Sequence, residues 1–176
     1  MQNLYIVPLE VSDSELIIRI VNELKKLFKT NVETVEINLD LSSCLSSDRN
    51  QYYSTKIISN SIPLTIDYNG KVILLLESDL FIPVFTYIFG EAQLNGKHSV
   101  VSLCRLHEEF YTGRTDDELL FQRTMKEILH EVGHNFGLHH CLNWECVMHS
   151  SKNVEEVDIK GATYCKECRV IFKSEV

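Results

Sequence analysis

The chain has 176 residues, 44% of them hydrophobic and 24% charged, with only 7 glycines and 3 prolines. This composition is that of a globular protein, and the length predicts one domain with one core rather than a low-complexity or linker-rich chain. The formal net charge of -8 at pH 7 argues against nucleic acid as a partner, because nucleic-acid binders usually carry a basic patch.

No segment of the sequence predicts a membrane partner or secretion. The longest aliphatic run is 72–76, far shorter than the roughly 20 apolar residues that cross a membrane. Residues 1–8 contain neither the basic segment nor the long apolar segment of a secretory signal. We therefore expect a cytoplasmic protein in a reducing environment, where close cysteine pairs bind metal more often than they form disulfides.

Short apolar runs in the first two thirds of the chain predict a sheet with packed helices. Four runs predict strands: Leu4–Val7, Val32–Leu39, Val72–Leu76 and Ser99–Leu103. Apolar spacings of three and four predict a helix over Ser12–Phe28, and Gln51–Ile58 predicts a shorter helix. Leu80–Gly96 is rich in aromatic residues and interrupted by proline and glycine, so it predicts an elaborated loop.

The clearest predicted helix begins at Thr115. Thr115 and Glu118 fit a capping box, in which the hydroxyl accepts from the third helical N–H and the glutamate reaches back. An apolar stripe predicts the face that packs on the core: Phe121, Met125, Ile128 and Val132. We expect the helix to end at Gly137, because glycine readily takes the left-handed conformation that ends helices.

Three residues of this helix point to metal chemistry. His130 and His134 differ by about 40° in direction, so both project from one face, opposite the apolar stripe. Glu131 lies close enough to flank a metal held by the two rings. The pentapeptide alone is also typical of a surface helix, but His140 follows from a loop beyond Gly137. It supplies the third corner of a tetrahedral zinc site whose fourth corner stays open for water.

The string HExxHxxGxxH, from His130 to His140, resembles the extended zinc signature of the metzincin metallopeptidases. Met148, seven residues after Cys141, stands in the right order for the methionine turn beneath such a zinc, although a methionine there is more often plain core. His139 precedes the third histidine, and we expect it to be solvated or to make a hydrogen bond to a neighbour.

Four of the six cysteines form two close pairs separated by eighteen residues: Cys141, Cys146, Cys165 and Cys168. Two such pairs commonly form a closed structural zinc site. The alternatives are two disulfides, or a redox-active pair made by the last two cysteines. We favour zinc, because binding the first pair to the second would fix His140 and Met148 on their short loop.

The complete run HExxHxxGxxHC-x4-C-x-M-x16-C-x-x-C, from His130 to Cys168, resembles the archaemetzincin family. Other metzincins lack the cysteine that directly follows the third histidine. Phe89–Ala92 and the stretch 100–106 are also similar to segments of that family, so the resemblance covers about half of the chain. His149 departs from the pattern, which has an apolar or aromatic residue there; it either approaches the zinc or, as we favour, lies at the surface.

The resemblance implies an α/β fold of the metzincin-like zincin type, with a mixed twisted sheet, packed helices, an active-site helix and a small zinc-braced C-terminal subdomain. We expect a single metallopeptidase domain over 1–176, divided into subdomains 1–137 and 138–176. In the family, the strand before the active-site helix is an antiparallel sheet edge above the cleft. That edge would be Ser99–Cys104 here, and an extended substrate could add to it.

The predicted function is zinc-dependent hydrolysis of peptide bonds, with two zinc ions per chain, one catalytic and one structural. The zinc held by the three histidines would activate a water, from which Glu131 takes a proton that it returns to the leaving amine. A peptide or protein substrate is the expected partner, and a monomer is favoured. The alternatives are a catalytically silent double-zinc binding module, which has no use for Glu131, and a disulfide oxidoreductase using Cys165 and Cys168.

Overall fold

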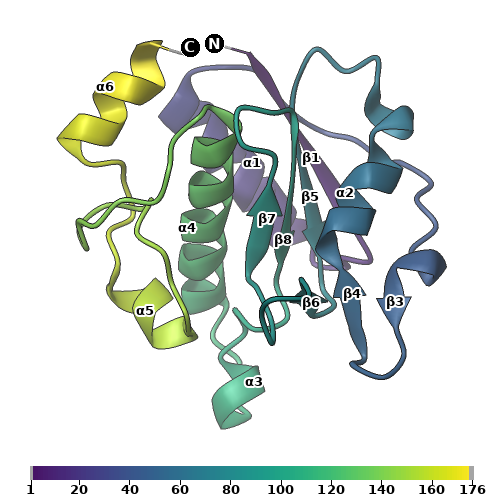
Figure 1. The fold of residues 1–176 in the computed structure, drawn as a ribbon. Helices are drawn as coiled ribbons and strands as arrows, with labels where there is room; N and C mark the ends of the chain where they lie inside the picture. The colour runs from purple at the N-terminus through teal and green to yellow at the C-terminus, as the bar shows by residue number, and fades with distance from the viewer. Residues whose placement is uncertain (1, 175–176) are drawn as a thin grey trace.

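A five-stranded twisted sheet forms the centre of the computed structural model, which describes residues 2–174 (Figure 1). The strand order is β2-β1-β5-β8-β7; the first four strands are parallel and β7 is antiparallel to β8. The strands of this sheet are β1 Asn3–Leu9, β2 Val32–Thr34, β5 Gly70–Leu76, β7 Gly90–Ala92 and β8 His98–Ser102. A second, three-stranded sheet consists of β3 Leu45–Ser46, β4 Gln51–Tyr53 and β6 Leu80–Phe81.

Six α-helices surround the sheets in the described part of the chain. They are α1 Ser14–Phe28, α2 Ser54–Ser61, α3 Glu109–Thr112, α4 Asp117–Asn135, α5 Val154–Ile159 and α6 Lys166–Ser174. Single 3-10 turns span Ser42–Cys44 and Pro63–Thr65. Among residues 2–174, no helix combines the length and the apolar character that crossing a membrane requires.

The two faces of the central sheet carry separate groups of buried apolar side chains. In β1, Leu4 and Ile6 pack on the face covered by α1 and α4, whereas Tyr5 and Val7 pack on the face covered by α2. Successive side chains of a strand alternate between faces, and both faces are covered here. This explains why β5 is a continuous apolar run rather than an alternating one.

The predicted α/β fold with a mixed, twisted sheet is confirmed, but some elements differ from their predictions. The strand predicted over Val32–Leu39 is shorter in the structure, where only Val32–Thr34 form β2. The Val35 N–H still donates to the Ile6 carbonyl, and beyond this bond the chain no longer pairs with β1. The helix predicted over Gln51–Ile58 begins only at Ser54. The three residues before it form β4, which pairs with β3 on one side and β6 on the other.

The predicted sheet edge at Ser99–Cys104 is wrong. Strand β8 is paired on both sides, with β5 in parallel and with β7 in antiparallel. The edge strand on this side of the sheet is β7, which lies within Leu80–Gly96, the segment predicted as a loop. A strand of three residues that reads Gly-Glu-Ala carries no apolar alternation, so its sequence does not distinguish it from a loop.

The N-cap of helix α4 lies one residue after the predicted one. Asp116, not Thr115, is the N-cap, and its Oδ1 accepts from the Leu119 N–H at 2.9 Å. Glu118 does not reach back; it pairs with Arg19 of α1 at 2.7 Å. The predicted end is confirmed, since Gly137 has a φ of 82° and follows directly after the last turn.

The stretch after Gly137 contributes to the same core as the sheet. Its buried apolar side chains join the cluster formed by α1 and α4: Leu138, Val147, Met148, Val154, Val157 and Phe172. Two helices that the sequence did not predict, α5 and α6, carry three of them, and α5 lies beside α4 in Figure 1. Ring stacking of Phe172 against Phe28 and Tyr164 anchors α6, with ring centroids 5.8 Å and 4.9 Å apart.

Candidate active site

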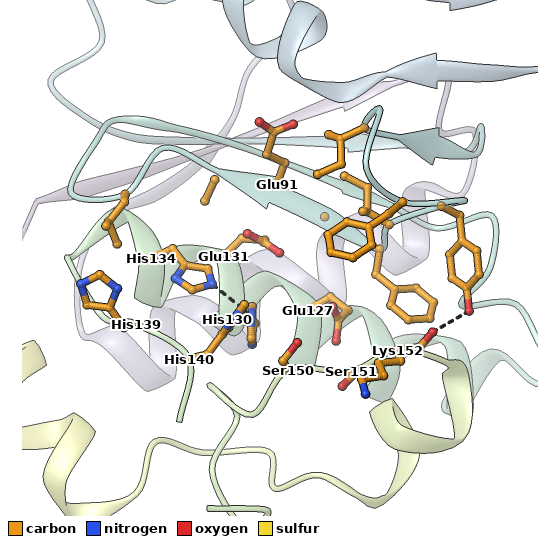
Figure 2. A pocket seen from close by; sticks show the side chains of 18 of the residues that line it. Glu91, Glu127, His130, Glu131, His134, His139, His140, Ser150, Ser151 and Lys152 are labelled. Carbon is orange, nitrogen blue, oxygen red and sulfur yellow. Dashed lines mark hydrogen bonds between the residues drawn. The ribbon is translucent and has the colours of Figure 1, made fainter. Parts of the chain in front are cut away.

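Helix α4 presents His130, Glu131 and His134 to a cavity of about 690 Å³ (Figure 2). The opposite face of the helix carries Ile128 and Val132, which are fully buried in the core. The helical arrangement expected from the sequence is therefore present. Packing of the apolar face fixes the direction in which the polar face points.

Each helical imidazole is oriented by a hydrogen bond from its Nδ1. His130 Nδ1 lies 2.8 Å from the Val147 carbonyl oxygen, and His134 Nδ1 lies 2.7 Å from that of Leu138. A carbonyl oxygen only accepts, so each Nδ1 carries the proton and each Nε2 presents a lone pair to the cavity. Burial lowers the pKa of both rings, which keeps them neutral as metal ligation requires.

The spacing of the ring nitrogens fits a bound cation. His140 joins from the loop after α4, and one ligand atom from each of the three rings lies within 4.8 Å of the others. The Nε2 atoms of His130 and His134 are 3.1 Å apart (Figure 2), near the roughly 3.3 Å between two nitrogen ligands of tetrahedral zinc. Two facing lone pairs repel each other unless a positive charge lies between them. The three histidines therefore fit zinc.

Glu131 is almost completely buried beside this cluster, with 4% of its surface exposed. Burial, and then the nearby Glu127 carboxylate, raises the pKa of Glu131 well above its ordinary value. The edge strand β7 lies directly against it, because a Cβ at Gly90 would be 2.6 Å from Glu131 Oε1. Only glycine at this position lets the strand approach the carboxylate so closely.

Met148, which the sequence predicts for a methionine turn, packs against helix α4 next to His134. It is fully buried, and a Cβ at Gly133 would collide with its Sδ, so the thioether packs against α4 between the two helical histidines. The Met148 carbonyl accepts from the Cys141 N–H at 2.9 Å. The turn is thereby joined to the residue that follows His140.

The four C-terminal thiols also converge. The Sγ atoms of Cys141, Cys146, Cys165 and Cys168 all lie within 4.8 Å of one another. Cys141 Sγ and Cys165 Sγ are 3.9 Å apart, near the roughly 3.8 Å expected between two sulfur ligands of tetrahedral zinc. Burial opposes ionisation of Cys146, but N–H groups that donate to its sulfur, including that of Cys165 at 3.3 Å, lower its pKa. These residues fit a second zinc.

The other two cysteines of the chain, and the other two histidines of the motif region, lie outside both clusters. Cys44 and Cys104 are free thiols in the N-terminal part of the fold. His139 is exposed at the rim of the cavity. His149 is neither a free surface side chain nor part of the imidazole cluster: its Nδ1 lies 2.9 Å from the Cys141 carbonyl oxygen, and its ring lies tilted against Trp144 with centroids 3.9 Å apart.

Several cavity residues were not predicted from the sequence. Glu127 lies one helical turn before Glu131, and the spacing of four residues is a signal that could have identified it. Tyr87 and the segment 150–152 also line the cavity. They come from segments without a motif, so only the folded chain brings them to the site.

The fold and this site define the class of zinc metallopeptidases. The family model described as Peptidase family M54 matches residues 7–174, and the chain belongs to that family. The archaemetzincin of Archaeoglobus fulgidus is 35% identical over 167 residues, which cover 94% of this chain and 95% of that protein. The archaemetzincin of Pyrococcus horikoshii is 41% identical over 123 residues, 69% of this chain; the aligned part spans 65% of that protein.

Solved structures agree over nearly the whole chain. The Archaeoglobus fulgidus archaemetzincin, solved in complex with malonate, matches with a TM-score of 0.83 at 34% identity, covering 96% of this chain and 99% of that one. The archaemetzincin of Methanopyrus kandleri matches with a TM-score of 0.86 at 29% identity, covering 98% and 94%. The resemblance inferred from the motif is confirmed.

Proposed function

We propose that this chain hydrolyses peptide bonds in the cavity above α4, with Glu131 as general base and with His130, His134 and His140 as ligands of a catalytic zinc. The main support is the placement of three neutral imidazoles around one point, with a buried carboxylate beside them. A purely structural metal site would need neither the carboxylate nor the cavity.

The residues divide the chemistry between them. Zinc bound to three neutral imidazoles would supply a Lewis acid that acidifies water and polarises a carbonyl. Glu131 takes a proton from the attacking water and passes it to the leaving amine. Burial makes the Glu131 carboxylate a stronger base than an exposed glutamate, which favours the first of these transfers.

The edge strand β7 offers main-chain groups to an extended substrate. Its inner side pairs with β8, and in the described sheet no strand follows it on its outer side. Gly90, Glu91 and Ala92 all line the cavity. A peptide added to this edge would lie across Glu131 and the imidazole cluster. The role first predicted for Ser99–Cys104 therefore passes to β7.

The four cysteines would hold a second, structural zinc, giving two zinc ions per chain. This site would brace a C-terminal subdomain, 138–176, against the N-terminal subdomain, 1–137, within one domain. Since thiolates remain available as ligands only where they stay reduced, we infer a reducing compartment such as the cytoplasm. The expected substrate is a peptide or protein, and we favour a monomer.

Metal analysis combined with digestion of a broad peptide library tests the proposal. Native protein should contain two zinc ions and should cleave peptides in a reaction that removal of one zinc abolishes. A protein with both metals but no cleavage would instead be the silent binding module. A protein with disulfides in place of the second zinc would favour the oxidoreductase alternative for Cys165 and Cys168.

A further inference from the structure

The cavity continues beyond the imidazole cluster into a subsite next to Glu127. Glu127, Ser151 and Lys152 line this part together with Tyr87 and Phe89. In Figure 2 the Glu127 carboxylate lies between the imidazole rings and the aromatic side chains. A substrate side chain next to the bond that is cut would enter this subsite.

The aromatic wall of the subsite is held rigidly. The Tyr87 hydroxyl donates to the Lys152 carbonyl at 2.8 Å, a bond drawn as a dashed line in Figure 2. Its ring is covered by the Arg105 guanidinium, 4.0 Å from the ring centroid, and Asp79 binds Arg105 at 2.7 Å. The edge of Tyr87 meets Phe89 with centroids 5.6 Å apart. The wall therefore limits the depth of the subsite and is apolar.

The floor of the subsite is polar but close to neutral in charge. Glu127 is 4% exposed, and its Oε1 lies 2.8 Å from Lys160 Nζ, whose side chain is 1% exposed. The ammonium neutralises the carboxylate from behind, since Lys160 does not line the cavity. Glu127 Oε1 thus has the Lys160 ammonium as its partner, whereas the buried Ser151 Oγ has no hydrogen-bond partner among the described residues.

This combination selects against two kinds of side chain. A lysine or arginine would bring a second cation next to a carboxylate that Lys160 already neutralises. A purely apolar side chain would offer no hydrogen-bond partner to the Glu127 carboxylate or to the Ser151 hydroxyl, which is unfavourable for buried polar groups. A neutral side chain with an apolar stem and a terminal N–H or O–H fits both the wall and the floor.

We propose that Glu127, Lys160 and Ser151 determine substrate specificity, and that the subsite takes a neutral side chain ending in a hydrogen-bond donor, such as glutamine. The inference rests on the proposed peptidase function and adds the substrate class. Lys160 acts through Glu127: it holds the carboxylate in place and cancels its attraction for cations.

Peptides that differ only at the positions flanking the cleaved bond test the inference. The wild type should cleave the glutamine peptide with a kcat/KM at least about tenfold above that of the isosteric methionine peptide. Ser151→Ala should lower this ratio. The double variant Glu127→Leu/Lys160→Met should reduce it to about one, and replacing a buried ion pair by apolar residues often leaves a protein folded.

Lys160→Met alone gives a second, opposite readout. It leaves the Glu127 carboxylate without its cation, so the ratio of kcat/KM for lysine over glutamine peptides should rise at least about tenfold. Lys126→Met is the matched control, because Lys126 Nζ donates to the Val157 and Asp158 carbonyls at the same helix interface but does not line the cavity. Its ratios should stay as in the wild type.

The outcomes separate this inference from the proposed function. Cleavage without a preference for glutamine over methionine, or a preference that the double variant and Ser151→Ala both retain, overturns the inference and leaves the peptidase function standing. No cleavage of any peptide by the zinc-loaded wild type contradicts the proposed function, and the inference with it.

Discussion

The imidazole cluster and the thiol cluster are neighbours along the chain, yet they are held in different ways. Two of the three imidazoles project from the 19-residue helix α4, and each is oriented by a backbone carbonyl. The four thiols come from a loop, a turn and the start of the short helix α6. The imidazoles line the cavity, whereas none of the four cysteines lines it.

This difference suggests different dependence on metal. The packed apolar face of α4 and the two Nδ1 hydrogen bonds restrain the rings of His130 and His134, so we expect these two ligands to stay near their positions without an ion. Contacts between neutral thiols are weak, so the thiol cluster depends on the charge of a metal to stay together. The imidazole cluster is therefore suited to catalysis, and the thiol cluster to stabilising the fold of the C-terminal stretch.

The largest expected effect is on folding, through the thiol cluster. Cys168→Ser should remove the structural zinc and sharply lower solubility and the melting temperature, because structural zinc contributes on the order of 10 kcal/mol. Metal content and thermal melting measure this. Cys104→Ser is the control, since Cys104 is a free thiol outside the cluster. A Cys168→Ser protein that stays folded with full activity would contradict the bracing role.

The next largest effect is on catalysis at the imidazole cluster. Glu131→Gln preserves size and leaves the three ligands intact, so zinc content and melting temperature should hardly change. Peptide hydrolysis should fall by at least about 100-fold, because the proton acceptor is lost. Glu155→Gln, at an exposed residue outside the cavity, should keep full activity. Equal cleavage by Glu131→Gln and wild type would rule out the proposed base.

A third test measures how folding stability depends on pH through histidines that are not predicted metal ligands. Burial, then the charge of Lys97, lowers the pKa of His98 to about 4, while its ordinary value is 6.5. Between these values the unfolded chain binds a proton that the folded chain does not, so stability falls as the pH drops from 6.5 to 4. In zinc-loaded protein, His98→Gln should lessen this loss by about 2 kcal/mol relative to wild type, a difference in which the shared metal contribution cancels.

His107 provides a control of opposite sign. Its hydrogen bond to Glu77, at 3.1 Å, raises its pKa. Its contribution to stability is therefore fully present below the unfolded pKa and is lost as the pH rises through the folded pKa. His107→Gln should lower stability at acidic pH. Parallel pH profiles of melting temperature for the two variants would refute these assignments.

The smallest expected effect concerns metal exchange. The open three-histidine site should lose zinc to a chelator faster than the closed four-cysteine site, by roughly tenfold or more. Activity should disappear with the first zinc, while the melting temperature falls only with the second. Zinc release and activity followed in one time course check this order. Simultaneous loss of both ions would show that the two clusters do not differ in the expected way.

Local sequence patterns were sufficient to predict the features that depend on residues only one or two helical turns apart. The spacing of His130 and His134 fixes their common face, and Gly137 ends the helix in the expected conformation. The apolar runs located the core strands. These features depend on neighbours in sequence, so periodicity and glycine chemistry suffice to predict them.

Features that depend on distant partners were decided only by the tertiary structure. Asp116 rather than Thr115 caps α4, and Glu118 pairs with Arg19 of another helix instead of reaching back. The edge strand β7 exists because β8 supplies its partner, since its own three residues carry no strand pattern.

The specificity subsite depends entirely on such distant contacts. Lys160 meets Glu127 across 33 positions of sequence, and Tyr87 meets Lys152 across 65. A charge or a hydroxyl far along the chain gives no sign in the sequence of which partner it will find. The sequence therefore predicted the histidines and cysteines that the structure brings into two clusters, whereas packing of the C-terminal stretch against α4 decided which other side chains line the cavity.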